Sequence, residues 1–120
     1  MKKILIIEDE DLILKALEFR LRRDGYDVLK APDGREGLKM IESQEFDLLI
    51  TDIMLPFNNG LEMVNRVKTV KGSTFPVIVL SNVGLENVVL DAFKLGADDY
   101  ITKPFSPTEL SIRVKRLLAR

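Results

Sequence analysis

The 120-residue chain contains no cysteine and no histidine. Without cysteine it has neither disulfide bonds nor thiolate metal ligands. Without histidine it cannot use a histidine general base, a Ser-His-Asp triad or a histidine-ligated zinc ion. Any catalytic or metal chemistry must therefore come from carboxylates, hydroxyl groups and lysine.

The chain also has no large excess of positive or negative charge, and it has no long apolar run. The 18 Lys and Arg residues nearly balance the 19 Asp and Glu residues, so no overall field attracts nucleic acid or an anionic membrane. No apolar stretch approaches the ~20 residues of a membrane span, and none is typical of a signal peptide. We therefore expect one globular domain, residues 1–120, in the cytoplasm.

Four short runs rich in Ile, Leu and Val each lead to polar residues that phosphate chemistry can use. These polar residues are Glu8-Asp9, Asp52, Ser81 and Lys103. Such runs, with helical patterns between them, are typical of buried strands in a parallel sheet. The carboxyl ends of parallel strands lie at one edge of the sheet, where ligands bind. We therefore expect these polar groups in one crevice.

The order of strands and helices predicts the fold class. Strands are expected at residues 4–7, 26–31, 47–51, 76–80 and 99–101, the last being the shortest. The first helix is expected to begin after Asp11, which would cap it. The second and fifth helices are expected to begin at the capping boxes 33–36 and 106–109. The third is expected to begin at about residue 61, and the fourth is expected over residues 85–95. This alternation predicts an α/β fold, a doubly wound (βα)₅ parallel sheet with helices on both faces. In the strand order 2-1-3-4-5, Asp9 and Asp52 lie side by side.

Three carboxylates near that point, from Glu8, Asp9 and Asp52, indicate a cation site. Each close pair costs about 4 kcal/mol at ~4 Å with an effective dielectric constant near 20. Such a cluster therefore either raises a pKa or binds a hard metal ion. Oxygen ligands without His or Cys suit Mg²⁺. Taken alone, Asp52 is also explained as a turn residue and Asp9 as an alternative helix cap.

Lys103 and Ser81 also have explanations that involve no function. Lys103 could be a solvated surface lysine, and Ser81 could cap the fourth helix. Lys103, however, lies between a short strand and Pro104, which favours an extended backbone. Functional roles are favoured because all these groups occur together, each after a different strand. No P-loop and no GxGxxG motif is present. Met54 stands where dehalogenase-type phosphatases have a second Asp.

The chain resembles the receiver domains of bacterial two-component response regulators over essentially all 120 residues. The segments that carry the resemblance are residues 6–10, 47–56 with Gly60, 79–81 and 96–105. The resemblance implies a flavodoxin-like fold, whose strand order is the one given above. Asp98–Phe105 and the charged last helix look most like receivers of the winged-helix transcription-factor subfamily.

The resemblance implies a chemical role for Asp52, which would accept a phosphoryl group from the phosphohistidine of a sensor histidine kinase. Mg²⁺ would be held by Asp9, Asp52 and the backbone carbonyl of Met54. Glu8 would help through a bound water molecule. The protein would modify itself and lose the phosphoryl group slowly, so it would not be an enzyme with a diffusible substrate.

The resemblance also implies a conformational switch. Lys103 would pair with the phosphoryl group and Ser81 would hydrogen-bond it, so that Tyr100 turns from an exposed to a buried position. Asn82 stands where the family usually has a small residue, and it either narrows access to the site or adds a hydrogen bond. Met54 and Val83 occupy positions that tune hydrolysis but cannot position water. We therefore expect a long-lived phosphoryl form.

The winged-helix subfamily dimerises through the fourth helix, the fifth strand and the fifth helix, using ion pairs. Asp98, Asp99, Glu109 and Arg113 are available for such pairs. Val88-Val89, however, stand where basic residues are common. If these two valines are exposed, they make the interface more apolar. The alternative is that one of the two valines belongs to the hydrophobic core.

Other functions stay open at this point. A phosphorylation-independent protein-binding module has no need of the intact set Asp9, Asp52, Ser81 and Lys103. A small Mg²⁺-dependent phosphatase is disfavoured by Met54. Direct DNA binding by Arg113, Lys115, Arg116 and Arg120 is weaker still, because basic residues near a helix carboxyl end interact favourably with its dipole. A DNA-binding output domain would lie outside this chain.

Overall fold

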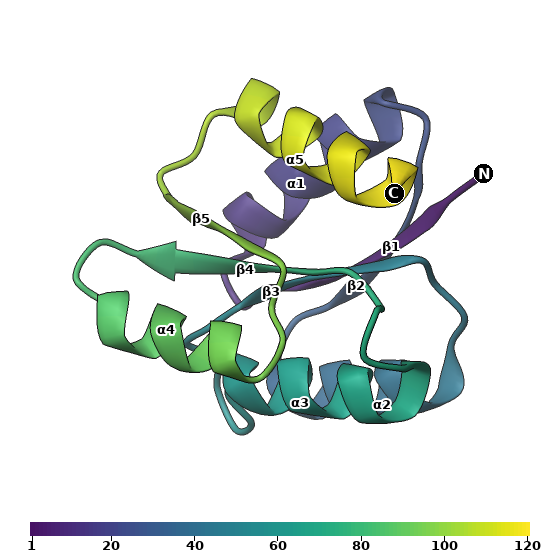
Figure 1. The fold of residues 1–120 in the computed structure, drawn as a ribbon. Helices are drawn as coiled ribbons and strands as arrows, with labels where there is room; N and C mark the ends of the chain where they lie inside the picture. Colours follow the sequence, from purple (N-terminus) through teal and green to yellow (C-terminus); the bar gives the residue numbers. More distant parts are fainter.

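The computed structural model describes residues 1–120, in which five strands alternate with five helices. The elements are β1 (Lys3–Ile7), α1 (Asp11–Arg23), β2 (Asp27–Ala31), α2 (Gly34–Ser43), β3 (Leu48–Asp52), α3 (Gly60–Lys71), β4 (Val77–Asn82), α4 (Glu86–Lys94), β5 (Asp99–Lys103) and α5 (Pro107–Ala119). One parallel sheet has the order β2-β1-β3-β4-β5. Helices α1 and α5 cover one face, and α2, α3 and α4 cover the other (Figure 1). The predicted fold class and strand order are confirmed.

The central strands are buried on both faces, which explains why their sequences are apolar without alternation. Along β1, Leu5 and Ile7 pack in a cluster with side chains of α2, α3 and α4. The residues that alternate with them, Ile4 and Ile6, pack in a second cluster with α1 and α5. All four side chains are fully buried, and each such burial stabilises the fold by about 1.5–3 kcal/mol. None of the helices is both long enough and apolar enough to span a membrane.

Three strands extend further towards the carboxyl edge than the sequence predicts. Strand β3 ends at Asp52, β4 at Asn82 and β5 at Lys103. Parallel pairing holds these ends in the sheet, as where Ser81 lies opposite Thr102. Strand β5 has five residues, as β1 does, so the expectation that it is the shortest is wrong. Asp52, Ser81 and Lys103 therefore project from paired strands, whereas Glu8 and Asp9 follow the end of β1.

Two of the predicted helix starts have the expected caps. The Asp33 side chain accepts a hydrogen bond from the Glu36 N–H at 2.9 Å, and Ser106 accepts one from the Glu109 N–H at 3.3 Å. These bonds satisfy donors that the first helical turn leaves free. The helices α2 and α5 thus begin where their capping boxes predict.

Two other predicted caps are wrong. Asp11 is the first residue of α1 rather than its cap, and its carboxylate lies 3.0 Å from Lys15 Nζ. An acidic side chain in the first turn still interacts favourably with the helix dipole. Ser81 does not cap α4, because it lies within β4 and the helix begins at Glu86 after Leu85.

Candidate functional site

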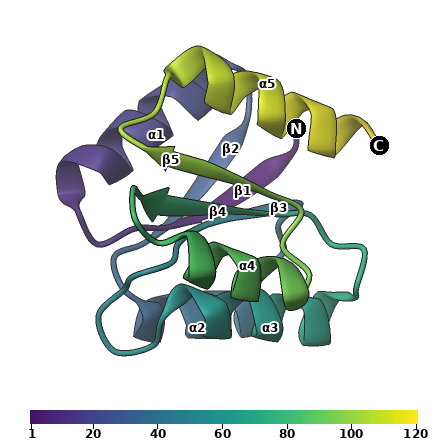
Figure 2. The same cartoon turned by 60° about the vertical axis from the view of Figure 1, so that its left-hand side comes forward.

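The carboxyl edge of the sheet brings four of the predicted residues into one cluster. Glu8 and Asp9 follow β1, and Asp52 ends β3. Carboxylate oxygens of these three residues lie within 4.8 Å of one another. Lys103 reaches them from β5 across the end of β4. The chain leaves β1 and β3 toward opposite faces of the sheet (Figure 2), and ligands bind where a parallel sheet has such a switch point.

Lys103 is a buried ion-pair partner, so the alternative of a solvated surface lysine is wrong. Its Nζ atom lies 2.5 Å from Asp52 Oδ2, 2.7 Å from Glu8 Oε1 and 3.9 Å from Glu10 Oε1. The contact with Glu8 lacks hydrogen-bond geometry, which leaves the buried Oε1 atom without a hydrogen-bond partner. One ammonium group therefore faces several carboxylates.

The pKa of Glu8 reflects its burial and, to a smaller extent, the negative charge beside it. Burial raises this pKa to about 7, and the Asp52 carboxylate adds to the rise, while the Lys103 ammonium and the Glu10 N–H oppose it. Burial alone would lower the pKa of Lys103, but its contacts with the Asp52 and Glu8 carboxylates outweigh burial and raise that pKa. The lysine therefore stays charged, and the site favours a further proton or cation.

Both oxygens of Asp52 are held by donors. Oδ2 pairs with Lys103, and Oδ1 accepts a hydrogen bond from the Met54 N–H at 3.2 Å. The residue is 3% exposed and belongs to β3, which distinguishes it from an ordinary turn aspartate. A Cβ atom at Gly60 would lie 2.2 Å from the Asp52 carbonyl oxygen, so α3 can begin this close only with glycine.

Ser81 lies next to this cluster without being bonded to it. It is buried at the end of β4, the strand between Asp52 and Lys103. Its hydroxyl donates to the Asn82 carbonyl oxygen at 3.0 Å. The side chain of Asn82 itself is exposed. The structure thus brings the acidic residues and Lys103 together but leaves Ser81 engaged with the backbone.

Comparison with known proteins gives the family. The family model of the response regulator receiver domain matches residues 4–115. The chain belongs to this family. The alkaline phosphatase synthesis transcriptional regulatory protein PhoP of Bacillus subtilis is 44% identical over 119 residues, which are 99% of this chain and 49% of that protein. The chain thus spans about half the length of this curated relative, and its predicted likeness to receivers of transcription factors is confirmed.

Solved structures agree with this assignment. A putative response regulator from Chloroflexus aurantiacus J-10-fl has 38% sequence identity and a TM-score of 0.92, covering 99% of this chain and 98% of that chain. A CheY-like response regulator receiver domain protein from Methanospirillum hungatei JF-1 has 31% identity and a TM-score of 0.93, covering 99% and 94%. The receiver fold therefore extends over the whole chain.

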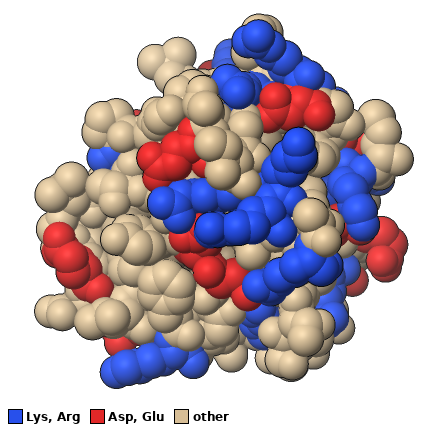
Figure 3. Space-filling view, turned by 45° about the horizontal axis from the view of Figure 1, so that its top comes forward, with Lys and Arg blue, Asp and Glu red and all other residues tan.

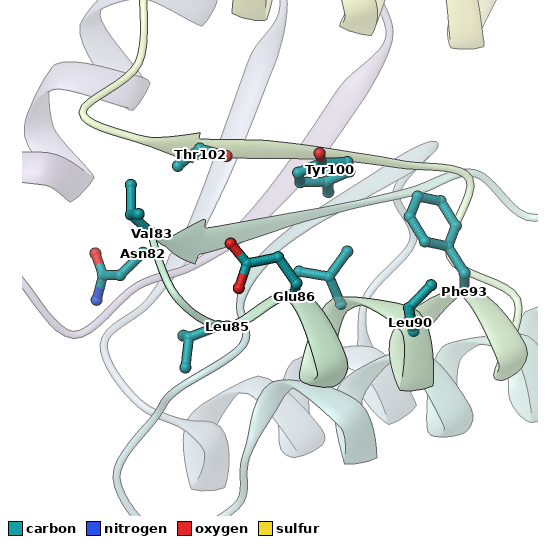
Figure 4. A pocket seen from close by; sticks show the side chains of 9 residues that line it. Asn82, Val83, Leu85, Glu86, Leu90, Phe93, Tyr100 and Thr102 are labelled. Atoms are coloured by element: carbon teal, nitrogen blue, oxygen red, sulfur yellow. The ribbon is translucent and has the colours of Figure 1, made fainter.

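The receiver domain also has a cavity of about 340 Å³ between α4 and β5, separate from the acidic cluster (Figure 4). Tyr100 lies at its border and is 42% exposed. Its ring packs edge-to-face on Phe93, with centroids 5.9 Å apart. Tyr100 is therefore exposed, with unfilled space beside it.

The ionic residues of the α4-β5-α5 face already have partners within the receiver domain. Asp99 lies 2.6 Å from an Arg113 nitrogen and 3.0 Å from an Arg116 nitrogen. Asp98 lies 3.1 Å from Lys68 Nζ and 2.7 Å from an Arg120 nitrogen. Figure 3 shows basic and acidic side chains interspersed on the side of the molecule that carries α5. Any partner at this face must compete with these internal pairs.

The apolar character of this face comes from residues other than the two predicted valines. Val89 belongs to the core, as one alternative held, and Val88 packs against it. Leu90 is 57% exposed, and Phe93 is partly exposed as well. Leu90 is exposed while Val89 is buried because successive residues of a helix point about 100° apart around its axis.

Sequence reasoning missed one direct contact of the site. Glu8 was expected to help hold Mg²⁺ through water, and its direct ion pair with Lys103 was not predicted. The sequence does not predict the direction of the Glu8 side chain. Strand β1 is buried on both faces, so its residues show no alternation of apolar and polar side chains from which that direction could be inferred. Glu10, 3.9 Å from the same ammonium, was missed for the same reason.

Proposed function

We propose that the receiver domain is a cytoplasmic, phosphorylation-controlled signalling switch in which Asp52 accepts the phosphoryl group. The observation that carries this proposal is the buried Asp52 carboxylate, held by Lys103 and the Met54 N–H beside two further carboxylates. A nucleophile held in one orientation reacts faster than a free one. The adjacent ammonium offsets charge that develops on the transferred group.

The donor in this proposal is the phosphohistidine of a sensor histidine kinase. A carboxylate oxygen of Asp52 attacks the phosphorus atom, and the new P–O bond forms as the P–N bond breaks. The imidazole leaves with the electron pair of that bond and takes up a proton from solvent. The product is an acyl phosphate, whose oxygens pair with Lys103 Nζ, now 2.5 Å from Asp52 Oδ2. No diffusible substrate is turned over.

A divalent cation fits the same cluster. Carboxylate oxygens of Glu8, Asp9 and Asp52 lie within 4.8 Å of one another, and a buried Glu8 oxygen has no hydrogen-bond partner. Asp9, Asp52 and the backbone carbonyl of Met54 would hold Mg²⁺, with Glu8 helping through water. Bound Mg²⁺ would neutralise charge on the phosphoryl oxygens.

The switch follows from the present contacts of Ser81 and Tyr100. A phosphoryl oxygen on Asp52 is a better acceptor than the Asn82 carbonyl to which the Ser81 hydroxyl now donates. Exchange of that bond draws the segment between β4 and α4 toward the site, and Tyr100 turns into the adjacent cavity. The changed α4-β5-α5 face then binds a second copy of the domain, or controls a DNA-binding output domain outside this chain.

The phosphoryl form should be long-lived. Met54 and Val83, which flank the site, have exposed side chains without a polar group that orients water. We expect the acyl phosphate to persist for minutes in a time course of intact-mass spectra. Hydrolysis that is complete within seconds would contradict this expectation.

The first test is phosphorylation by acetyl phosphate in Mg²⁺, followed by intact-mass spectrometry. We expect a single phosphoryl adduct that needs Mg²⁺, is lost in Asp52→Asn and persists in the control Asp91→Asn, which changes an exposed α4 carboxylate. An adduct that persists in Asp52→Asn would show that another residue is the acceptor. Mg²⁺ binding without any adduct would favour the alternative of a phosphorylation-independent protein-binding module.

A further inference from the structure

We propose that Arg35 is a positioning residue of the metal site. By stacking on Phe57 it holds the β3–α3 loop, residues 53–59, and with it Met54, against Asp52. This inference rests on the proposed Mg²⁺ site. It adds a residue of α2, outside the acidic cluster, that determines how well Mg²⁺ binds.

Phe57 has a backbone conformation that is unfavourable for a residue with a bulky side chain. Its φ angle of 70° is the only positive one at a non-glycine residue, and bulky L residues rarely adopt this region. The side chain is 69% exposed, so burial does not offset the cost. Instead, the guanidinium carbon of Arg35 lies 4.0 Å from the centroid of the Phe57 ring. A cation–π contact of this kind stabilises the otherwise disfavoured loop conformation.

The backbone of the same loop contacts the first turn of α2. The Gly34 N–H donates to the Pro56 carbonyl oxygen at 3.3 Å. A Cβ atom at Gly34 would lie 1.9 Å from the Asn58 carbonyl oxygen, so only glycine allows this approach. The consecutive residues Gly34 and Arg35 therefore hold the middle of the loop.

One end of the loop is bonded to the acidic cluster, and the two ends are bonded to each other. The Met54 N–H donates to Asp52 Oδ1 at 3.2 Å. At the other end, the Gly60 N–H donates to the Ile53 carbonyl oxygen at 2.7 Å. Because Met54 lies in the chain between Asp52 and the residues that contact α2, a displacement at Phe57 reaches Met54 through two intervening residues. Release of the stacking contact should therefore loosen the metal site without touching a carboxylate.

The test is a titration of the whole chain with MgCl₂, followed through the amide chemical shift of Met54. We expect Arg35→Ala to weaken Mg²⁺ binding by about two- to fivefold, the range given by a cation–π contact at an exposed site. The matched control is Arg66→Ala, since the exposed Arg66 links α3 to Glu42 of α2 without contacting the loop. Its Mg²⁺ affinity should equal that of the wild type.

A double-mutant cycle separates stacking from a general effect on stability. In a Phe57→Tyr background, which keeps the aromatic ring, Arg35→Ala should weaken binding as before. In a Phe57→Leu background, which keeps the backbone cost and removes the ring, Arg35→Ala should have no further effect. Equal losses in both backgrounds, or no loss in the wild type, would overturn the proposal.

Gly34→Ala gives an independent check of the backbone contact. The added methyl group must displace the loop, so Mg²⁺ binding should weaken more than in Arg35→Ala. If Gly34→Ala does not fold, the Arg35 cycle alone decides. A wild type that binds no Mg²⁺ would refute the proposed metal site and this inference with it. Equal Mg²⁺ affinity of wild type and Arg35→Ala would refute only the positioning role.

Discussion

Strand β5 has an ion-pair cluster at each end, and the two clusters have opposite charge balance. At the amino end, two carboxylates, from Asp98 and Asp99, face the basic side chains of Lys68, Arg113, Arg116 and Arg120. At the carboxyl end, the single ammonium of Lys103 faces carboxylates of Glu8, Asp52 and, further away, Glu10. The first cluster satisfies its acids within the chain, whereas the second keeps an excess of buried negative charge.

This difference in charge balance distinguishes a structural cluster from the candidate functional site. Arg116 and Arg120 are largely exposed, and such pairs contribute about 0.2–1 kcal/mol each. There, Asp99 raises the pKa of Arg113, as expected for a satisfied pair. At the carboxyl end, burial and like charge raise the pKa of Glu8 instead. A buried carboxylate with a perturbed pKa, such as that of Glu8, indicates a candidate functional site.

Removal of the lysine should have the largest effect on stability. We expect Lys103→Met to lower the free energy of unfolding by roughly 3 kcal/mol without Mg²⁺, because buried carboxylates lose their cation. At the other end, Arg116→Met should cost about 1 kcal/mol or less, since Arg116 is mostly exposed and Asp99 keeps Arg113. Urea denaturation in EDTA measures both. Equal costs would mean that the two clusters do not differ as argued.

The pH dependence of stability should come from Glu8. Because burial raises its pKa from 4.5 to about 7, the folded state binds the proton more tightly than the unfolded state. This contribution is complete below the unfolded pKa and is lost as the pH rises through about 7. Relative to Glu8→Gln, the Mg²⁺-free wild type should lose roughly 2 kcal/mol between about pH 5 and pH 8.

Denaturation of both proteins across this pH range, with EDTA and with Mg²⁺, tests the sign of the effect. Mg²⁺ should reduce the loss, since it favours the ionised carboxylate. A difference that stays constant, or that grows in favour of the wild type as the pH rises, would contradict the proposed origin of the shift.

The smallest effect is also the most direct test of the comparison, because one change is made at both ends. Without Mg²⁺, Asp52→Asn should raise the free energy of unfolding by about 1 kcal/mol, since it removes one negative charge from a cluster in which carboxylates outnumber the single ammonium. Asp99→Asn should lower it by about 1 kcal/mol, because Arg113 and Arg116 lose their partner. Thermal or chemical denaturation gives both values. Shifts of the same sign would remove the distinction between the clusters.

Much of the fold was predictable because its signals are local. The apolar run from Ile4 to Ile7, the capping boxes at Asp33 and Ser106, and the stop at Gly25 are each contained in a few consecutive residues. The candidate site residues were predictable for a related reason, since a parallel sheet gathers whatever follows its strands at one edge. The ends of β3, β4 and β5 were not, because pairing with a neighbouring strand decides how far a strand extends.

The sequence by itself thus determined the alternation of strands and helices, the parallel sheet and the edge at which its polar residues meet. Only the tertiary structure decided that Glu8 pairs directly with Lys103, that Asp98 and Asp99 have partners within the chain, and that Arg35 stacks on Phe57. The physical reason is range. Helices and strands follow from neighbours along the chain, whereas the bond from Lys103 to Asp52 joins residues 51 positions apart, whose side chains meet only in the packed domain.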